Sequence, residues 1–189
     1  MFVTVSACAQ KTSRVCRAAC DPIFTPEFFA PYQQAIETAF WLLCDAREHM
    51  RGPFEVCAMT SRLKSPSSIR GKLIKKGLPI TEAAAHAALR DIAGLRVVLA
   101  STQAVYDFAA LLRRSSIAQI EEEQDYIASP KASGYRSLHL ILRVPVSLKN
   151  RLFLLPAEIQ LRTAGMDVWA NIEHELIYKP VKTQQNAPV

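Results

Sequence analysis

Two stretches in which apolar and polar residues alternate, 138–146 and 152–163, predict strands that bury one face. Continued back by three residues, the first strand would carry an aromatic ring, a hydroxyl and an imidazole together on its other face: Tyr135, Ser137 and His139. The second strand would carry three polar side chains opposite its apolar ones: Glu158, Gln160 and Arg162. The pattern therefore predicts a polar surface that lies over an apolar core.

Shorter apolar runs predict three further strands, at 54–59, 95–100 and 117–120. Apolar residues at three-to-four spacing, bounded by capping residues, proline and glycine, predict five helices, at 25–51, 65–77, 81–90, 102–114 and 164–178. The strand at 117–120 is expected to end at an acidic tract, 121–125. This mixed order of helices and strands indicates one α/β layer structure.

A single domain is expected in residues 23–180, because the chain of 189 residues is long enough for one proper core and shows no linker. Residues 1–22 are weakly patterned and predict a poorly ordered lead-in, whereas 181–189 predict a featureless tail. No apolar run is long enough to span a membrane, and the five cysteines lack zinc-like spacing. We therefore expect a cytoplasmic protein with reduced thiols.

The charge favours anionic partners. The net charge is +6 and the pI is about 9.2, which suits nucleotides or RNA better than a membrane surface. Between Val56 and Thr81 there is no acid, yet six basic residues occur there: Arg62, Lys64, Arg70, Lys72, Lys75 and Lys76. A solvated helix face usually mixes signs, so this cluster predicts an anion-binding role.

Two acids at strand positions suggest a metal site. Asp91 lies at the mouth of the strand at 95–100, and Glu158 lies beside Gln160 on the polar face of another strand. Such carboxylates near many cations would hold Mg²⁺ together with phosphate oxygens, and one of them would accept a proton from an attacking hydroxyl. The alternative is that Glu158 pairs with Arg162 across a solvated face. The residues alone leave both open.

The aromatic and histidine residues also allow two interpretations. Tyr135 would stack on a base or belong to the core, and His139 would be catalytic or a satisfied histidine under the sheet. Trp169 is expected in the core. Neither common glycine-rich phosphate loop is present. The residues by themselves therefore indicate a Mg²⁺-dependent nucleotide or phosphoryl-transfer site, or an RNA-binding domain.

Five motifs occur in order between residues 25 and 180: Arg-Leu-Lys at 62–64, Asp-Ile-Ala-Gly-Leu-Arg at 91–96, Asp-Tyr through to Leu-His across 125–139, Glu-Ile-Gln-Leu-Arg-Thr at 158–163 and Trp-Ala-x-x-Glu-His at 169–174. Together they resemble the (p)ppGpp synthetase domain of the RelA/SpoT-homologue family, most closely its small, single-domain alarmone synthetases. The resemblance implies a mixed β-sheet flanked by helices, related to the nucleotidyltransferase fold. It also implies a pyrophosphokinase that moves the β,γ-diphosphate of ATP to the 3′-hydroxyl of GTP or GDP and releases AMP.

The resemblance implies a role for each matching residue. Asp91 would bind Mg²⁺, and Glu158 would orient or deprotonate the acceptor hydroxyl and help to hold the metal. The ATP site would use two arginines around the adenine and three lysines on the phosphates: Arg62, Arg96, Lys64, Lys72 and Lys75. The GTP site would use a tyrosine stacked on guanine, a lysine on the acceptor phosphates and two supporting residues: Tyr135, Lys131, His139 and Gln160. Physical chemistry agrees, because diphosphate transfer needs placement and charge neutralisation above all.

Several features depart from the family pattern. The tract 122–125 is acidic where many members carry basic residues, so acceptor preference and metal behaviour need not follow theirs. The chain stops soon after Pro180, short of the helices that build the tetramer of the small synthetases. A homo-oligomer therefore stays open, as does RNA binding. A hydrolase motif of the His-Asp type is absent from the sequence, so we expect synthesis without breakdown.

Two alternative functions remain at this stage. A toxic relative of the small synthetases would pyrophosphorylate tRNA 3′ ends or make adenosine alarmones, and the basic charge is compatible with it. A non-catalytic, regulatory RNA-binding domain is the other. The presence of both Asp91 and Glu158 argues against that second alternative, because RNA binding alone needs neither acid.

Overall fold

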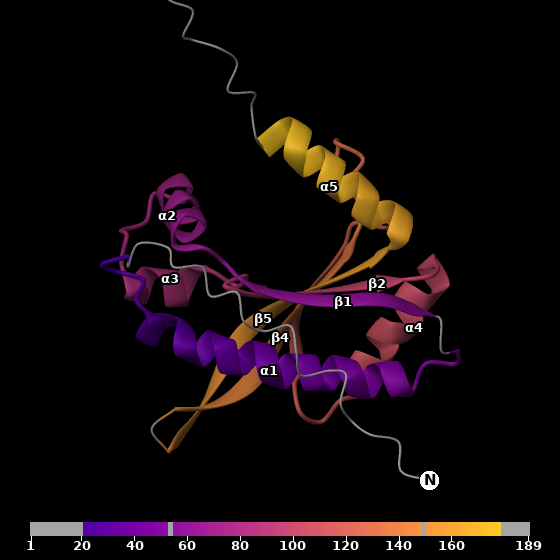
Figure 1. Cartoon of the computed structure of the whole chain (residues 1–189), viewed down its shortest axis with the longest axis horizontal. Coiled ribbons are helices and arrows are strands. Elements are labelled where there is room, and N and C mark those ends of the chain that lie inside the picture. Colours follow the sequence, from indigo (N-terminus) through magenta and orange to yellow (C-terminus); the bar gives the residue numbers. More distant parts are fainter. Residues whose placement is uncertain (1–20, 53–54, 149, 179–189) are drawn as a thin grey trace, which may run out of the picture.

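The computed structural model describes residues 21–52, 55–148 and 150–178, which form one mixed α/β domain of five helices and a five-stranded sheet (Figure 1). The helices are α1 (Pro26–Glu48), α2 (Pro66–Lys75), α3 (Glu82–Ala88), α4 (Thr102–Arg113) and α5 (Ala164–Tyr178). The strands are β1 (Val56–Leu63), β2 (Ala93–Leu99), β3 (Gln119–Asp125), β4 (Leu138–Leu148) and β5 (Arg151–Thr163). The predicted fold class is confirmed. The expected tail at 181–189 and the lead-in at 1–22, apart from its last two residues, lie outside the described residues.

The sheet has the strand order β1-β2-β5-β4-β3, in which β2 and β5 are parallel and the other neighbours antiparallel. Its register aligns one residue of each strand in rows across the sheet. One row consists of Arg62, Gly94, Glu158, Ile141 and Glu122. The next row on the same face consists of Thr60, Arg96, Gln160, His139 and Gln124. Side chains far apart in sequence thus meet on one polar face.

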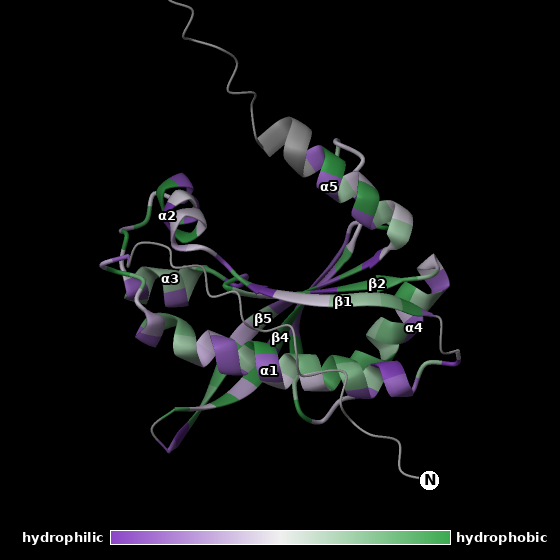
Figure 2. Ribbon diagram, viewed as in Figure 1, coloured by the Kyte–Doolittle hydropathy of each residue, from purple (hydrophilic) through white to green (hydrophobic). Residues whose placement is uncertain are grey.

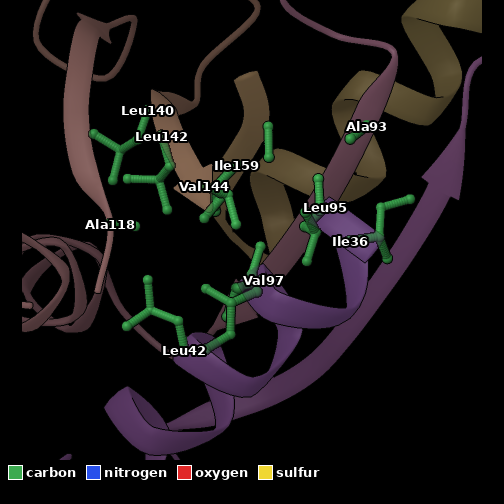
Figure 3. Packing of buried hydrophobic residues seen from close by; sticks show 14 of the residues in the cluster. Ile36, Leu42, Ala93, Leu95, Val97, Ala118, Leu140, Leu142, Val144 and Ile159 are labelled. Carbon is green, nitrogen blue, oxygen red and sulfur yellow. The ribbon is translucent and has the colours of Figure 1, made fainter. Parts of the chain in front are cut away.

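The opposite, apolar face of the sheet is covered by α1, with α4 packed beside it (Figure 1). In Figure 3 Ile36 and Leu42 of α1 lie beside Leu95 and Val97 of β2, and all four side chains are buried. Complete burial of a side chain of this size contributes roughly 2 kcal/mol. This face therefore supplies the main stability of the domain and leaves the polar face for other uses.

Most helix starts agree with the capping residues in the sequence. The side chains of Thr25, Ser65, Thr81 and Ser101 each accept a hydrogen bond from the backbone N–H three residues later. Other boundaries differ: β1 continues four residues beyond the expected end at 59, and α3 ends at Ala88 rather than at 90. The longer β1 follows from tertiary pairing, because it extends along β2 as far as Leu63. The helix α3 ends where Leu89 adopts an extended conformation.

The expectation that a strand ends at residue 120 is wrong, because the acidic tract itself forms most of β3. β3 is an edge strand with one paired side, where charged side chains are tolerated. Arginines also neutralise it: Arg143 and Arg90 lie 2.6 and 3.7 Å from Glu121, and Arg113 lies 2.6 Å from Glu123. The acids thus find partners on neighbouring elements, a fact that propensity along the chain does not contain.

Helix α5 lies over the polar face, on the other side of the sheet from α1 (Figure 1). Figure 2 shows strongly hydrophobic positions along it, and Val168 and Ile172 are 58% and 46% exposed. The prediction that Trp169 belongs to the core is wrong, because it is 47% exposed and its indole N–H donates to the Ser133 carbonyl at 3.3 Å. In the described ranges, no helix is long and apolar enough to cross a membrane.

Candidate active site

Three adjoining cavities hollow the polar face of the sheet. The cavity on the α2 side measures about 250 Å³ and is lined by Lys72, Asp91 and Glu158 among others. The central cavity, of about 120 Å³, lies over the strands, and the one under α5 measures about 580 Å³. Glu158 lines the first two, whereas Arg96 lines the central and the α5-side cavities. Except for Lys64 and Lys75, the predicted site residues therefore line one shared polar surface.

Two lysines meet on Asp91 at the α2 end of this surface. Asp91 lies in the turn before β2, Lys64 follows β1 and Lys72 belongs to α2. Both ammonium groups lie 2.8 Å from Asp91 Oδ2. Burial raises the pKa of Asp91, but the hydrogen bonds from the two lysines outweigh it and hold the pKa below its usual range. Asp91 is therefore ionised at neutral pH.

The other predicted lysine of α2 lies differently. Lys75 is exposed, and the α2-side cavity is lined by Lys72 and Lys76. Residues four apart on a helix share a face, which explains why Lys72 and Lys76 point to the same cavity. A role for Lys75 at the ATP phosphates stays a prediction.

Glu158 occupies the middle of the polar face on β5. His139 Nδ1 lies 3.2 Å from one carboxylate oxygen, and Gln160 Nε2 donates to the other at 2.9 Å. Burial raises the pKa of Glu158, but His139 and Gln160 together lower it further than burial and the nearby Asp91 raise it. The alternative pairing of Glu158 with Arg162 is wrong, since Arg162 bonds to other partners.

Tyr135 forms an aromatic platform at the α5 end. Its hydroxyl accepts a hydrogen bond from Arg162 at 2.7 Å and lies 2.7 Å from His139 Nε2. The Lys131 ammonium lies 4.8 Å from the centre of its ring and 4.4 Å from that of Tyr126. The predicted common face of Tyr135 and His139 is thus present, although regular β4 begins only at Leu138.

Arg62 and Arg96 lie on neighbouring strands and both line the α5-side cavity. The pKa of Arg96 is lowered chiefly by burial and then by Arg162, while Asp167 raises it. Arg96 Nη1 lies 3.0 Å from an Asp167 oxygen. Planar guanidinium groups are suited to stacking on a base. The same cavity also contains the aromatic ring of Tyr135.

The sequence pattern described as a region found in RelA / SpoT proteins matches residues 61–183. The chain belongs to the RelA/SpoT family. GTP pyrophosphokinase YwaC of Bacillus subtilis (strain 168) is 39% identical over 145 residues, which cover 77% of this chain and 69% of the relative. GTP pyrophosphokinase YjbM of the same organism is 34% identical over 157 residues, with coverage of 80% and 72%.

Solved structures of RelA/SpoT relatives share the fold. The small alarmone synthetase 1 from Bacillus subtilis, bound to its product pppGpp, superposes with a TM-score of 0.72 at 33% identity and covers 86% of this chain and 82% of its own. A GTP pyrophosphokinase family protein from Streptococcus pneumoniae gives a TM-score of 0.73 at 37% identity, with coverage of 80% and 75%. The fold of this family member is therefore that of the small synthetases.

The donor set of this RelA/SpoT family member fits a divalent metal ion. The described residues contain no group of three or more His, Cys, Asp or Glu that could hold a metal. Asp91 and Glu158, however, line one cavity, and the buried Oδ1 of Asp91 has no hydrogen-bond partner in the part of the chain that the structure describes. Mg²⁺ is commonly held by one or two carboxylates while substrate phosphates and water complete its shell.

Sequence reasoning missed three residues that the structure adds to this RelA/SpoT site. The Tyr126 ring lies 5.2 Å from that of His139, and Arg162 donates to both Tyr135 and Gln160. Asp167, in the first turn of α5, accepts a hydrogen bond from Arg162 and forms an ion pair with Arg96. The position of Arg162 on the polar face was visible in the alternation along β5. The place of Asp167 depends on how α5 folds back over the sheet, which no local pattern reveals.

Proposed function

We propose that this RelA/SpoT family member is a GTP pyrophosphokinase. It transfers the β,γ-diphosphate of ATP to the 3′-hydroxyl of GTP or GDP and yields pppGpp or ppGpp together with AMP. One observation carries the proposal: Glu158 lines both the cavity with Lys72 and Lys76 and the central cavity with Arg62 and Arg96, two arginines that also line the cavity of Tyr135. The similar proteins named GTP pyrophosphokinases, and the similar structure bound to pppGpp, support it.

ATP is the donor in this proposal. Its adenine stacks against Arg62 and Arg96, whose guanidinium groups line one cavity. Its phosphates bind the lysines at the α2 end, Lys64 and Lys72, with Lys75 as a further contact. In the free protein Asp91 holds both Lys64 and Lys72, so their ammonium groups are already gathered where phosphate charge would arrive.

GTP or GDP is the acceptor, with its guanine on Tyr135 and its phosphates near Lys131. Arg162, which is 3% exposed, holds the tyrosine hydroxyl and thereby keeps the ring in place. His139 lies beside this ring, Gln160 shares the partner Arg162 with it, and both residues also contact Glu158. The same two residues thus join the acceptor base site to the carboxylate that serves the reacting hydroxyl.

Glu158 acts on the acceptor 3′-hydroxyl. Because its pKa is lowered, the carboxylate is ionised at neutral pH and ready to accept the proton. The 3′-oxygen then forms a bond to the β-phosphorus of ATP, the bond from that phosphorus to the bridging α–β oxygen breaks, and its electron pair leaves with AMP. In-line placement and neutralisation of the phosphates by Lys64 and Lys72 supply much of the rate.

Mg²⁺ is the cofactor in this proposal. Asp91 would hold it, with Glu158 as a second ligand, and when bound it would neutralise charge on the transferred phosphates. The substrates are cytoplasmic nucleotides, so we also propose that the protein acts in the cytoplasm.

The test offers γ-labelled ATP and Mg²⁺ to the purified chain with GTP, GDP, ATP or tRNA as acceptor. We expect label on GTP and GDP, with one AMP released per transfer, and no transfer when the metal is chelated. Label on tRNA or on a second adenosine nucleotide would instead assign the chain to the toxic relatives. RNA binding without any transfer would overturn catalysis altogether.

A further inference from the structure

Asp167 lies between the two halves of the site. It belongs to the first turn of α5, and one of its oxygens, Oδ1, accepts a hydrogen bond from Arg162 at 3.1 Å and forms an ion pair with Arg96 Nη1 at 3.0 Å. Asn171, one turn later, lies 3.4 Å from its other oxygen. A single carboxylate oxygen therefore joins strand β2 to strand β5 from above the sheet.

The two arginines serve different nucleotides. Arg96 and Arg162 line the same α5-side cavity, but Arg96 is assigned to the donor adenine. Arg162 instead holds Tyr135, assigned to the acceptor base, and the side-chain oxygen of Gln160, at 2.7 and 2.6 Å. Arg162 and Arg96 carry the same charge, and their side chains are only 4% and 30% exposed. Two partly desolvated cations repel each other unless an anion lies between them, and Asp167 is that anion.

Asp167 acts on the nucleotides through these arginines. The residues that line the three described cavities include Arg96 and Arg162 but not Asp167. The Nε of Arg96 is buried and has no hydrogen-bond partner among residues 21–52, 55–148 and 150–178, so the ion pair with Asp167 is what holds this guanidinium. Loss of that ion pair would let the Arg96 guanidinium, which is assigned to the donor adenine, change its orientation.

We propose that Asp167 is a positioning residue that fixes the donor-base and acceptor-base subsites relative to each other. This inference rests on the proposed function, because it assumes that Arg96 stacks on the adenine of ATP and that Tyr135 stacks on the guanine of the acceptor. It predicts that one substitution outside the cavities weakens the binding of both nucleotides. The reacting groups at Glu158 and Asp91 stay intact.

The primary variant is Asp167→Asn, which keeps the shape of the side chain but removes its charge. The amide loses the ion pair with Arg96 and weakens the charge-assisted hydrogen bond from Arg162. We expect this to raise the KM for ATP and the KM for GTP about tenfold each. Because Asp167 touches no reacting atom, kcat falls by no more than about threefold. The conservative variant Asp167→Glu, which keeps the charge, restores most of both affinities.

The matched control is Asp107→Asn. Asp107 is also a helical aspartate that accepts a bond from a side chain one turn away, Gln103 at 3.0 Å, but it lies on α4 across the sheet. It should leave both KM values unchanged. A double variant separates the effect through Arg96 from the effect through Arg162. When Asp167→Asn is added to Arg96→Ala, the KM for GTP should rise further, whereas the KM for ATP should not change.

Equilibrium dialysis with ATP alone and with GTP alone measures both affinities without turnover, and thermal melting reports folding. If the wild-type chain binds both nucleotides but transfers nothing, the proposed function fails while the role of Asp167 is still measured. The inference is overturned if Asp167→Asn weakens only one nucleotide, or neither, or if it lowers the melting temperature alone. Should Asp167→Asn fail to fold, the comparison of Asp167→Glu with Arg96→Ala decides by the same two affinities.

Discussion

The two faces of the sheet use the same strands in different ways. Along β5, Ala157, Ile159 and Leu161 are completely buried against the helix layer, whereas Glu158 and Gln160 alternate with them on the polar face. Packing on the apolar face consists of many weak, non-directional contacts. Groups on the polar face instead have specific partners at hydrogen-bond distance, as Asp91 has in Lys64 and Lys72.

This difference predicts a division of labour between the faces. A change on the apolar face removes buried area and so lowers the free energy of unfolding, while the cavities keep their lining. A change on the polar face alters charge and geometry at the nucleotides, but removes little apolar area. The comparison would break if single substitutions on either face changed stability and chemistry to the same degree.

The largest effect is expected from Glu158→Gln. The amide keeps the size of the side chain but cannot accept the proton of the acceptor hydroxyl, so kcat should fall about 10³-fold, within the range for loss of a general base. Its thermal melting temperature should stay close to that of the wild type. Rapid-quench measurement of AMP release gives kcat, and calorimetry gives the melting temperature.

Glu123→Gln is the control for this substitution. Glu123 also lies on a strand of the sheet, but it is exposed and pairs with Arg113 on the outer edge. It should retain full activity. A Glu158→Gln enzyme with more than a tenth of the wild-type kcat would remove Glu158 from the proton transfer.

A smaller free-energy change, of the opposite kind, is expected from Leu140→Ala on the apolar face. Leu140 is completely buried, and truncation of such a leucine costs about 3 kcal/mol of unfolding free energy, part of it from the cavity left behind. Urea unfolding measures this loss, and both KM values should be unchanged at temperatures where the variant is folded. Leu152→Ala, at a side chain that is 73% exposed, should cost less than about 0.5 kcal/mol. A normal stability for Leu140→Ala together with altered KM values would reverse the roles of the two faces.

The apolar face was the more predictable of the two. Alternation along β4 and β5 identified their buried positions, because a strand turns every second side chain to the same side. The capping residues Thr25 and Ser65 located the starts of α1 and α2, because these side chains bond to the backbone of the next turn. Both signals depend only on residues that are close together in the sequence, so they can be read from the sequence alone.

The partners on the polar face could not be predicted in the same way. That Asp91 meets Lys64 and Lys72, or that Glu158 meets His139, depends on strand order and register, which bring distant segments together. The prediction of Trp169 as core failed for the same reason. Helical spacing gave it an apolar stripe, but α5 packs over a polar loop at Ser133 instead of over the core.

The smallest effect is expected on the free energy of unfolding, when an ion pair on the polar face is removed. Asp91→Asn should lower the unfolding free energy of the nucleotide-free protein by about 1 kcal/mol near neutral pH, the usual net value of a hydrogen bond. The pKa of Asp91 is lowered on folding, despite its burial, by Lys64 and Lys72. Its contribution is therefore complete above the ordinary carboxyl pKa of about 3.9 and is lost as the pH falls through the lower value of the folded state. Urea unfolding in the presence of a chelator should show this difference in unfolding free energy at neutral pH, and the difference should disappear in acid. The control Asp45→Asn, at a side chain that is 72% exposed, should show little difference at either pH. A gap that persists in acid would mean that the shape of Asp91, rather than its charge, stabilises this end of the polar face.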